Sequence, residues 1–236
     1  MTLKIMIGWD GRETVAWHTL AHSIITRASR PVMICPVILN QLRSVYHRPR
    51  DPMQSTDFTF SRFLTPYIAG GGISVFMDCD MLCLTDINEL EEIALANLYH
   101  DVLVVKHDYT PSRAVKFLHQ AQLPYPCKNW SSVMVFNGHR SSVKKLTPEY
   151  VNRASGMDLH QFKWANSVGE LPVEWNHLVG EYKPNPRAKI VHYTLGTPCF
   201  RDYQNCEYAF EWFQEQGMMN HCEDSVLPPA TASASG

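Results

Sequence analysis

The sequence predicts an α/β fold, in which a mostly parallel central sheet with flanking helices forms a single domain. Short apolar runs alternate with helical segments in the front half of the chain, as in strands joined by crossover helices. Ile73–Met77 is one continuous apolar run, which is typical of a strand buried on both faces. With 236 residues, 45% of them hydrophobic and 19% charged, the chain has the size and composition of a globular domain.

Local patterns predict the first three elements. Leu3–Gly8 is an apolar run that ends in glycine, so we expect a strand and a turn. A helix follows from about Glu13, because apolar residues recur there at each turn. Residues 31–39 are expected to form the next strand, and Pro36 favours either the edge of the sheet or an irregular stretch because proline cannot donate to the ladder. The apolar stripe of the helix consists of Ala16, Leu20 and Ile24, with Trp17, Ala21 and Ile25 beside them.

The remaining elements follow a long polar loop. Residues 40–56 contain two prolines and are predicted as this loop. Residues 58–68 are expected to be helical, and residues 101–106 and 132–136 to be strands. The last helix is expected near residues 205–214. Its apolar face is predicted to consist of Cys206, Ala209, Phe210 and Phe213.

Composition and charge restrict the class of protein. We expect one domain over residues 1–226 and a disordered tail at 227–236, which is small, polar and proline-rich. Lys and Arg total 21 against 23 Asp and Glu, and a net charge of −2 argues against a general nucleic-acid binder. No secretory signal or run of about 18 apolar residues is present, so neither secretion nor stable membrane insertion is expected. Seven cysteines without a CxxC pair favour free thiols in a cytoplasmic protein.

Two carboxylates follow the most apolar strand. Asp78 and Asp80 lie two residues apart in extended chain, so their side chains point the same way. Ligands of α/β sheets bind at the carboxyl ends of strands. Adjacent carboxylates repel unless a cation lies between them, and Mg²⁺ and Mn²⁺ prefer such oxygen ligands. A metal site for a diphosphate is therefore one interpretation, and a solvated turn is the other.

Seven segments of the chain, taken in order, resemble a known enzyme family. They are IGWDGRE (7–13), FSRFLTPY (60–67), FMDCDM (76–81), VVKHDY (104–109), KNWSSVMVFN (128–137), GELPVEWNHLVGEY (169–182) and IVHYTLGTPCF (190–200). Together they resemble the retaining glycosyltransferases of family 8, which have the GT-A fold, and most closely a bacterial branch of that family. The resemblance covers roughly residues 3–213.

The resemblance implies a metal-dependent site. The family's aspartate pair, here Asp78 and Asp80, binds Mn²⁺ (or Mg²⁺), and its first aspartate also touches the ribose of the donor. A histidine near the C-terminus, here His192, completes the metal ligands. The family's usual donor is a UDP-sugar. Taken alone, His192 is more typical of a surface or core histidine.

The resemblance also implies contacts for the nucleotide. Gly8, Trp9 and Asp10 correspond to the strand end that holds the base and ribose, although an ordinary turn with a core tryptophan explains them as well. Arg62 corresponds to an arginine that contacts the donor, and its competing interpretation is a surface salt bridge. Gly196 lies where backbone N–H groups approach the diphosphate. The family's lysine is missing there, so Gly196 or Arg201 is expected to replace it.

Contacts with the sugars are expected from the second half of the chain. Lys106 and Asp108 follow a strand and face the donor sugar in this interpretation. Ser131 and Ser132 stand where many members have Asn-Ser-Gly. Gln161 lies near the family's Asp-Gln pair at the reacting face, but the aspartate is His160 here.

The acceptor side of the family's site corresponds to Trp175 and Asn176. Trp175 either stacks on a sugar or is a core tryptophan. The aromatic residues of the chain mark either an acceptor groove or a homodimer contact.

The function implied is a hexosyltransferase that transfers a sugar, with retention, from a nucleotide-sugar donor to a carbohydrate or glycoconjugate acceptor. Gln161 and Asp80 are the candidate catalytic residues, and both a front-face route and a covalent intermediate stay open. A sugar-phosphate nucleotidyltransferase is disfavoured because residues 8–18 form no glycine-rich phosphate loop. A metal-dependent phosphatase needs more ligands. A non-catalytic nucleotide-sugar-binding module is the third alternative, because the lysine and the aspartate are replaced.

Overall fold

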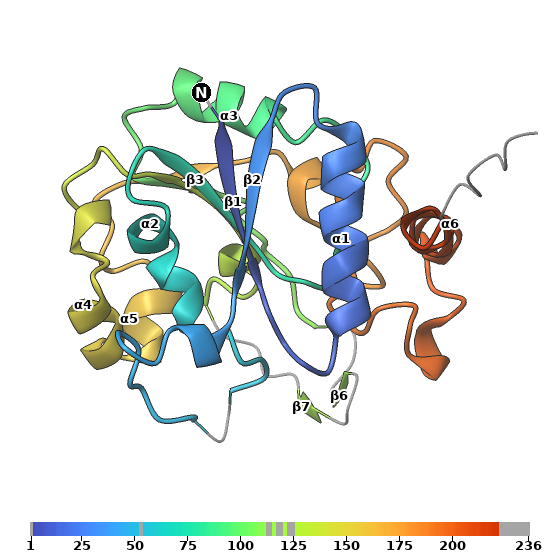
Figure 1. Ribbon diagram of the computed structural model, residues 1–236, viewed down its shortest axis with the longest axis horizontal. Coiled ribbons are helices and arrows are strands. Elements are labelled where there is room, and N and C mark those ends of the chain that lie inside the picture. The colour runs from blue at the N-terminus through green and yellow to red at the C-terminus, as the bar shows by residue number, and fades with distance from the viewer. Residues whose placement is uncertain (1, 52–53, 112–114, 117–119, 122–125, 222–236) are drawn as a thin grey trace, which may run out of the picture.

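The central element of the computed structural model is a six-stranded sheet (Figure 1). The structure describes residues 2–51, 54–111, 115–116, 120–121 and 126–221. The strand order is β2-β1-β3-β8-β5-β9. In chain order these strands are β1 (Leu3–Gly8), β2 (Val32–Val37), β3 (Ile73–Met77), β5 (Val102–Val104), β8 (Val133–Asn137) and β9 (Val168–Glu170).

Most strand pairs in this sheet are parallel, which confirms the predicted fold class. β1 pairs in parallel with both β2 and β3, and β5 pairs in parallel with β9. β8 is the exception, because it runs antiparallel between β3 and β5. β2 is at the edge of the sheet, as Pro36 predicted, since a proline there removes no ladder bond to a further strand.

A second, smaller sheet consists of three short strands. It contains β4 (Met81–Cys83), β10 (His177–Leu178) and β11 (Ile190–His192), in the order β10-β11-β4. β11 pairs antiparallel with β4 and in parallel with β10. The third sheet is the two-residue pair β6 (Val115–Lys116) and β7 (Gln120–Ala121).

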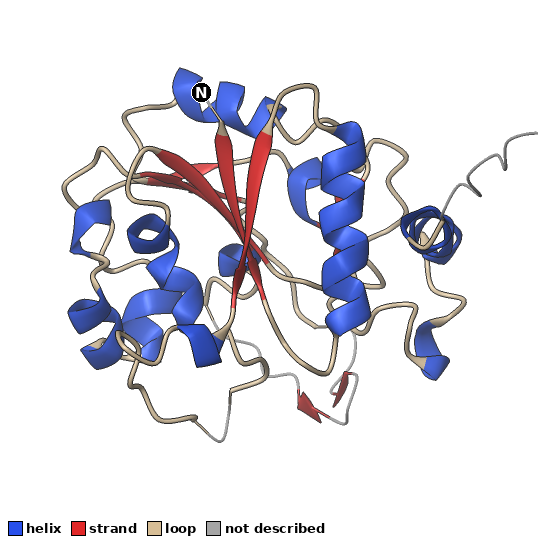
Figure 2. Cartoon of the chain, viewed as in Figure 1, coloured by secondary structure: helices blue, strands red, loops and turns tan. Residues whose placement is uncertain are grey.

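Helices flank the central sheet on both sides (Figure 2). α1 (Thr14–Arg27) and α6 (Ala209–Met219) lie on one side, and α2 (Thr65–Ile68), α4 (Pro148–Arg153) and α5 (Gly156–His160) on the other. α3 (Glu89–Ala96) lies at one end of the sheet. The 3₁₀ turns are η1 (Leu39–Gln41), η2 (Ser61–Leu64), η4 (Trp130–Ser132), η5 (Val143–Lys145), η6 (Val173–Asn176) and η7 (Arg201–Tyr203).

The core forms between the sheet and these helices. In the predicted stripe of α1, Ala16, Leu20 and Ile24 are fully buried, as expected, but Ile25 is 61% exposed. The predicted face of the last helix was correct for Ala209, which is buried, but wrong for Phe210 and Phe213, which are exposed. Phe210 is 76% exposed, whereas Trp212 is completely buried, because α6 begins at Ala209 and turns its Ala209–Trp212 side toward the core.

Other expectations concern the loop, the tail and the cysteines. Apart from η1, residues 40–56 are irregular where the structure describes them, as predicted. The predicted disordered tail, 227–236, lies outside the described residues. The six described cysteines are free. In the part of the chain that the structure describes, no helix has the length and apolar character that a membrane crossing requires.

Candidate functional site

The site lies where the chain passes from the large sheet to the small one. Asp78 follows β3 directly, and its backbone N–H donates to Ser132 O at 2.9 Å. Asp80 precedes β4, and its carbonyl accepts a hydrogen bond from Tyr193 N at 2.8 Å. In the β4–β11 ladder Met81 is opposite His192. This register brings a histidine that is more than a hundred residues away to the aspartate pair.

The three side chains predicted as metal ligands are together in the structure. Ligand atoms of Asp78, Asp80 and His192 all lie within 4.8 Å of one another. The Nε2 atom of His192 is 3.3 Å from Asp80 Oδ1, and both residues are buried. Carboxylate oxygens with one imidazole nitrogen suit Mn²⁺ and are compatible with Mg²⁺. The donor set therefore fits a divalent cation.

A buried arginine holds the first aspartate. Arg62 Nη1 lies 2.7 Å from Asp78 Oδ1 and donates to Ser131 O at 2.8 Å. The guanidinium carbon is also 5.2 and 5.0 Å from the ring centres of Phe58 and Phe76. Arg62 is only 6% exposed, so the interpretation as a surface salt bridge was wrong. The buried positive charge stabilises the ionised form of Asp78.

A chain of hydrogen bonds holds His192 from its other side. Its Nδ1 atom is 3.0 Å from Asn176 Oδ1. The Nδ2 atom of Asn176 donates to Ser132 Oγ at 2.8 Å and to Asn129 O at 3.3 Å. All four residues belong to segments that carry the family resemblance, but no sequence pattern indicated that Asn176 contacts the histidine.

The end of β1 differs in detail from its expected role. A Cβ atom at Gly8 would lie 2.5 Å from Cδ2 of Phe58, so glycine is required there by protein packing. Trp9 is partly exposed, and its ring centre lies 5.6 Å from that of Trp17 and 5.9 Å from that of His18. Trp9 thus has both a supporting aromatic face and some surface open to a ligand.

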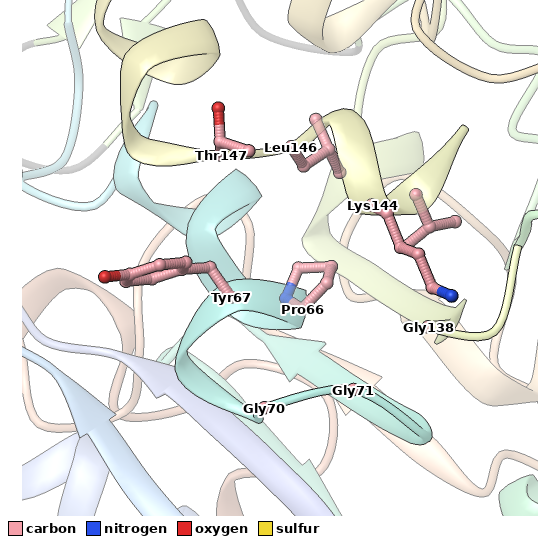
Figure 3. A pocket seen from close by; sticks show the side chains of 9 residues that line it. Pro66, Tyr67, Gly70, Gly71, Gly138, Lys144, Leu146 and Thr147 are labelled. Carbon is pink, nitrogen blue, oxygen red and sulfur yellow. The ribbon is translucent and has the colours of Figure 1, made fainter. Parts of the chain in front are cut away.

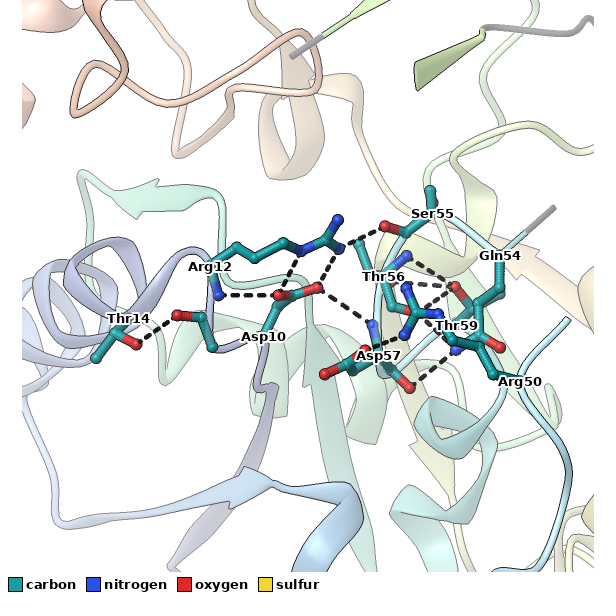
Figure 4. A network of polar contacts seen from close by, with 10 residues as sticks. Asp10, Arg12, Thr14, Arg50, Gln54, Ser55, Thr56, Asp57 and Thr59 are labelled. Carbon is teal, nitrogen blue, oxygen red and sulfur yellow. Dashed lines mark hydrogen bonds and ion pairs between the residues drawn. The ribbon is translucent and has the colours of Figure 1, made fainter. Parts of the chain in front are cut away.

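Asp10 anchors the long loop to this strand end (Figure 4). Its carboxylate accepts hydrogen bonds from Arg12 Nε at 2.8 Å and Asp57 N at 3.3 Å, and Arg12 Nη2 donates to Ser55 O at 2.7 Å. Burial alone would raise the pKa of Asp10, but the hydrogen bonds and charge of Arg12 outweigh it and keep the pKa below its ordinary value. Asp10 is therefore ionised, and it joins β1 to the end of the loop.

His160 occupies the place of the family's aspartate but has another chemistry. Its Nδ1 atom is 2.8 Å from Ser131 Oγ, and its ring packs edge-on against Phe63 at 5.1 Å. Burial, with the positive charge of Arg62 nearby, lowers the pKa of His160 to about 3. His160 is therefore neutral at physiological pH. Gln161, the next residue, is the partly exposed C-cap of α5.

Three further residues were expected to contact the donor: Lys106, Gly196 and Arg201. Lys106 follows β5, and its Nζ atom is 6.0 Å from the ring centre of Trp130. Gly196 already donates its N–H to Tyr193 O at 2.8 Å. Arg201 begins η7 and is exposed. Gly196 also borders a cavity of about 310 Å³ that is lined by Val179, Gly180, Tyr193, Leu195, Asp202, Tyr203, Asn205, Cys206 and Glu207.

Trp175 belongs to the core. It is 1% exposed, and Lys189 Nζ lies 4.9 Å from its ring centre. Of the two interpretations of Trp175, the structure therefore supports the core tryptophan.

Sequence reasoning missed His107. It lies between Lys106 and Asp108, is 6% exposed, and has Nδ1 2.8 Å from Tyr182 Oη. Burial, together with the charges of the neighbouring His192 and His177, lowers the pKa of His107 to about 3. The available signal was the position of His107 between Lys106 and Asp108. Side chains alternate along an extended chain, so if these two residues face the donor, His107 points inward.

A second pocket is remote from these residues (Figure 3). It has a volume of about 300 Å³. Its lining includes Gly70 and Gly71, which precede β3, whereas Asp78 follows the same strand. The pocket is therefore at the amino end of β3, away from the metal-ligand group. The full lining is Pro66, Tyr67, Gly70, Gly71, Gly138, Val143, Lys144, Leu146 and Thr147.

Comparison with curated proteins shows one relationship clearly. The chain is 40% identical over 227 residues to protein CDI of Arabidopsis thaliana, which covers 92% of this chain and 87% of that protein. The chain belongs to the family of protein CDI. No family model matches the chain.

Solved glycosyltransferases share the fold of this member of the CDI family. WbbM, a bifunctional glycosyltransferase, aligns with a TM-score of 0.61 and 15% identity, over 91% of this chain and 49% of its own. GlyE of Streptococcus pneumoniae TIGR4 aligns at 0.61 and 11%, over 92% and 60%. The galactosyltransferase LgtC, in complex with donor and acceptor sugar analogs, aligns at 0.56 and 12%, over 93% and 97%. The chain thus spans about half of WbbM and three-fifths of GlyE, and its fold is GT-A.

Proposed function

We propose that this protein is a retaining glycosyltransferase similar to those of family 8. It transfers a hexose from a UDP-sugar to a hydroxyl of a carbohydrate or glycoconjugate acceptor, with Mn²⁺ or Mg²⁺ as cofactor. The observation that carries the proposal is the convergence of Asp78, Asp80 and His192 at the carboxyl end of β3 in a GT-A fold. The solved LgtC complex with donor and acceptor sugar analogs supports sugar transfer by such a fold.

The residues around the aspartate pair prepare the site for a diphosphate. A divalent cation bound there would neutralise the phosphate oxygens and stabilise the departing nucleotide diphosphate. Arg62 holds Asp78 in position through its 2.7 Å contact. Asp80 presents its carboxylate toward His192 Nε2. These groups are already in place before a ligand arrives, so little reorganisation is needed.

The other proposed contacts divide between nucleotide and sugar. Trp9 is assigned to the base, with Gly8 and Asp10 shaping the turn beneath it. Lys106 and Ser132 are assigned to the donor sugar, and Gly196 to the diphosphate.

Gln161 is assigned to the reacting face together with Asp80. Its amide can donate or accept a hydrogen bond there, but an amide is a poor nucleophile. The proposed role of Gln161 is therefore to hold the sugar while the leaving group departs.

A non-catalytic nucleotide-sugar-binding module is the second candidate. Residues 195–200 contain no lysine, and the N–H group of Gly196 is already bonded to Tyr193 O. Both features reduce the number of groups available to bind the leaving diphosphate. The two candidates differ in turnover, because both bind the donor but only the enzyme releases free UDP.

Release of UDP from UDP-glucose and UDP-galactose tests the enzyme against the binding module. We expect slow hydrolysis of one donor with Mn²⁺, and none with EDTA. Asp80→Asn is expected to lose this activity by 100-fold or more, on the order of the loss of one key electrostatic group. Asp158→Asn, which removes an exposed carboxylate on α5, serves as the control. Donor binding without any UDP release, with a panel of sugar acceptors present, would support the binding module instead.

A further inference from the structure

We propose that Asn176 is a positioning residue for the metal site, and that it fixes His192 with Nδ1 protonated and Nε2 directed at Asp80. The inference rests on the proposed function, because it assigns a role within the same metal site. The resemblance had placed Asn176 near the acceptor. The structure instead buries it completely, 3.0 Å from the Nδ1 atom of His192.

The hydrogen bonds determine which way the Asn176 amide faces. Ser132 Oγ donates its proton to Asn129 O at 2.7 Å, so it can only accept from Asn176. Asn129 O is also an acceptor, at 3.3 Å. Both partners therefore require the NH₂ group of Asn176 on their side. The amide oxygen is left facing His192.

This orientation determines the state of the histidine ring. An amide oxygen can only accept, so the 3.0 Å contact requires a proton on Nδ1 of His192. In the neutral ring the lone pair is then on Nε2, which lies 3.3 Å from Asp80 Oδ1. Metal-bound histidines commonly donate their other N–H to an oxygen in this way, which fixes the ring and its tautomer.

Strand register explains why Asn176 reaches this place. It ends η6 and leads directly into β10, where Leu178 is opposite His192 in the parallel pair with β11. Val179 N donates to His192 O at 2.9 Å, which continues the same ladder. The two backbones are therefore locked side by side, and the Asn176 side chain is held beside the imidazole.

Ser132 connects the two halves of the site. Its carbonyl accepts from Asp78 N at 2.9 Å, and its hydroxyl accepts from Asn176 Nδ2 at 2.8 Å. One residue thus holds the aspartate on the large sheet and, through Asn176, the histidine on the small sheet. Loss of the Asn176 amide would leave His192 free to rotate or change tautomer while the aspartates stay in place.

The first experiment compares Asn176→Leu with a matched control. Asn137→Leu also removes a buried asparagine, whose amide donates to Leu98 O at 2.9 Å, away from the metal ligands. Mn²⁺ affinity is measured by electron paramagnetic resonance in the presence of UDP. We expect about 10- to 100-fold weaker binding for Asn176→Leu, as for loss of an outer-shell partner, and wild-type affinity for Asn137→Leu. Unchanged affinity in a folded Asn176→Leu variant would overturn the inference.

The second experiment does not depend on the folding of a variant. Nitrogen-15 NMR of the metal-free wild-type protein at pH 8 reports which ring nitrogen of His192 carries a proton, with assignment from His192→Gln. We expect a proton on Nδ1, and an unprotonated Nδ1 would overturn the inference. Failure of the wild-type protein to bind Mn²⁺ with UDP is a different result, and it would contradict the proposed function.

Discussion

Arg62 and Asp78 form a largely buried ion pair, in which Nη1 and Oδ1 are 2.7 Å apart and the side chains are 7% and 13% exposed. The pair joins η2 to the end of β3. The same guanidinium binds Ser131 O, so it also fixes the turn before β8. Arg62 is therefore a structural organiser of the site as well as a proposed donor contact.

Removing Arg62 is expected to affect stability more than removing an exposed arginine. Arg62→Met leaves Asp78 without its buried partner, which typically costs about 3–5 kcal/mol. Arg153→Met, whose ion pair with Glu149 is highly exposed, is expected to cost about 0–1 kcal/mol. Urea unfolding of both variants measures the difference, and equal free energies of unfolding would contradict the structural role of Arg62.

Gly8 is predicted to be essential for packing. In Gly8→Ala the new methyl group overlaps the ring of Phe58, and we expect a loss of about 1–3 kcal/mol. Gly11→Ala is the control, because no atom lies within 4 Å of a Cβ there. The double variant Gly8→Ala with Phe58→Leu should show a coupling that relieves part of the loss. Additive effects in this cycle, measured by thermal or urea unfolding, would contradict the overlap.

The stabilising contribution of Asp101 is expected to be lost in acid, when its carboxylate is protonated. Burial raises the pKa of its fully buried carboxyl, but hydrogen bonds from Arg140 and from the backbone N–H groups of Asn166 and Ser167 outweigh burial and lower the pKa. A lowered folded-state pKa gives stability that is present above the ordinary value, near 4, and is lost as the pH falls through the folded pKa.

Asp101→Asn measures this contribution. The variant loses the ion pair with Arg140 and is expected to be about 1–3 kcal/mol less stable at pH 7. Its free energy of unfolding should also depend less on pH than that of the wild type between pH 5 and pH 2. This interval lies around and below the ordinary aspartate pKa, because the folded-state pKa is lowered. An acid dependence as steep as that of the wild type would show that Asp101 does not carry the effect.

Two aromatic residues of α6, Trp212 and Phe210, are expected to contribute very differently to stability. Trp212→Ala removes a fully buried ring, and we expect a cost of about 3–5 kcal/mol. Phe210→Ala is expected to change stability by no more than about 0.5 kcal/mol, because that ring is 76% exposed. A large loss for Phe210→Ala would mean that this ring contacts another surface in solution, and light scattering would then identify a homodimer.

Local patterns predicted five of the six strands of the central sheet, but not β9 or the short strands of the smaller sheet. β1 and β3 match the sequence expectation because their apolar runs are continuous and bounded by turns. The antiparallel direction of β8 was not predicted, because periodicity carries no information about strand direction. The predicted face of α6 included Cys206, but the helix begins only at Ala209, after Tyr208, which adopts a left-handed backbone conformation with φ of 57°.

The metal-ligand group was predictable only through the resemblance. The Asp78–Asp80 pair is visible as a motif, but His192 joins it through the β4–β11 register, which is a tertiary property. Asn176 shows the limit most clearly. Its contact with His192 depends on which amide atom faces which neighbour, and no local pattern encodes that choice.

The most direct test of the central claim is the thermal stability of the protein with UDP, in Mn²⁺ and in EDTA. A ligand that binds only the folded state raises the unfolding midpoint by mass action. We predict that UDP raises the midpoint only with Mn²⁺, and that Asp80→Asn abolishes the rise while Asp158→Asn retains it. If UDP gives no rise in Mn²⁺, or the same rise in EDTA, the metal–diphosphate site formed by Asp78, Asp80 and His192 is contradicted.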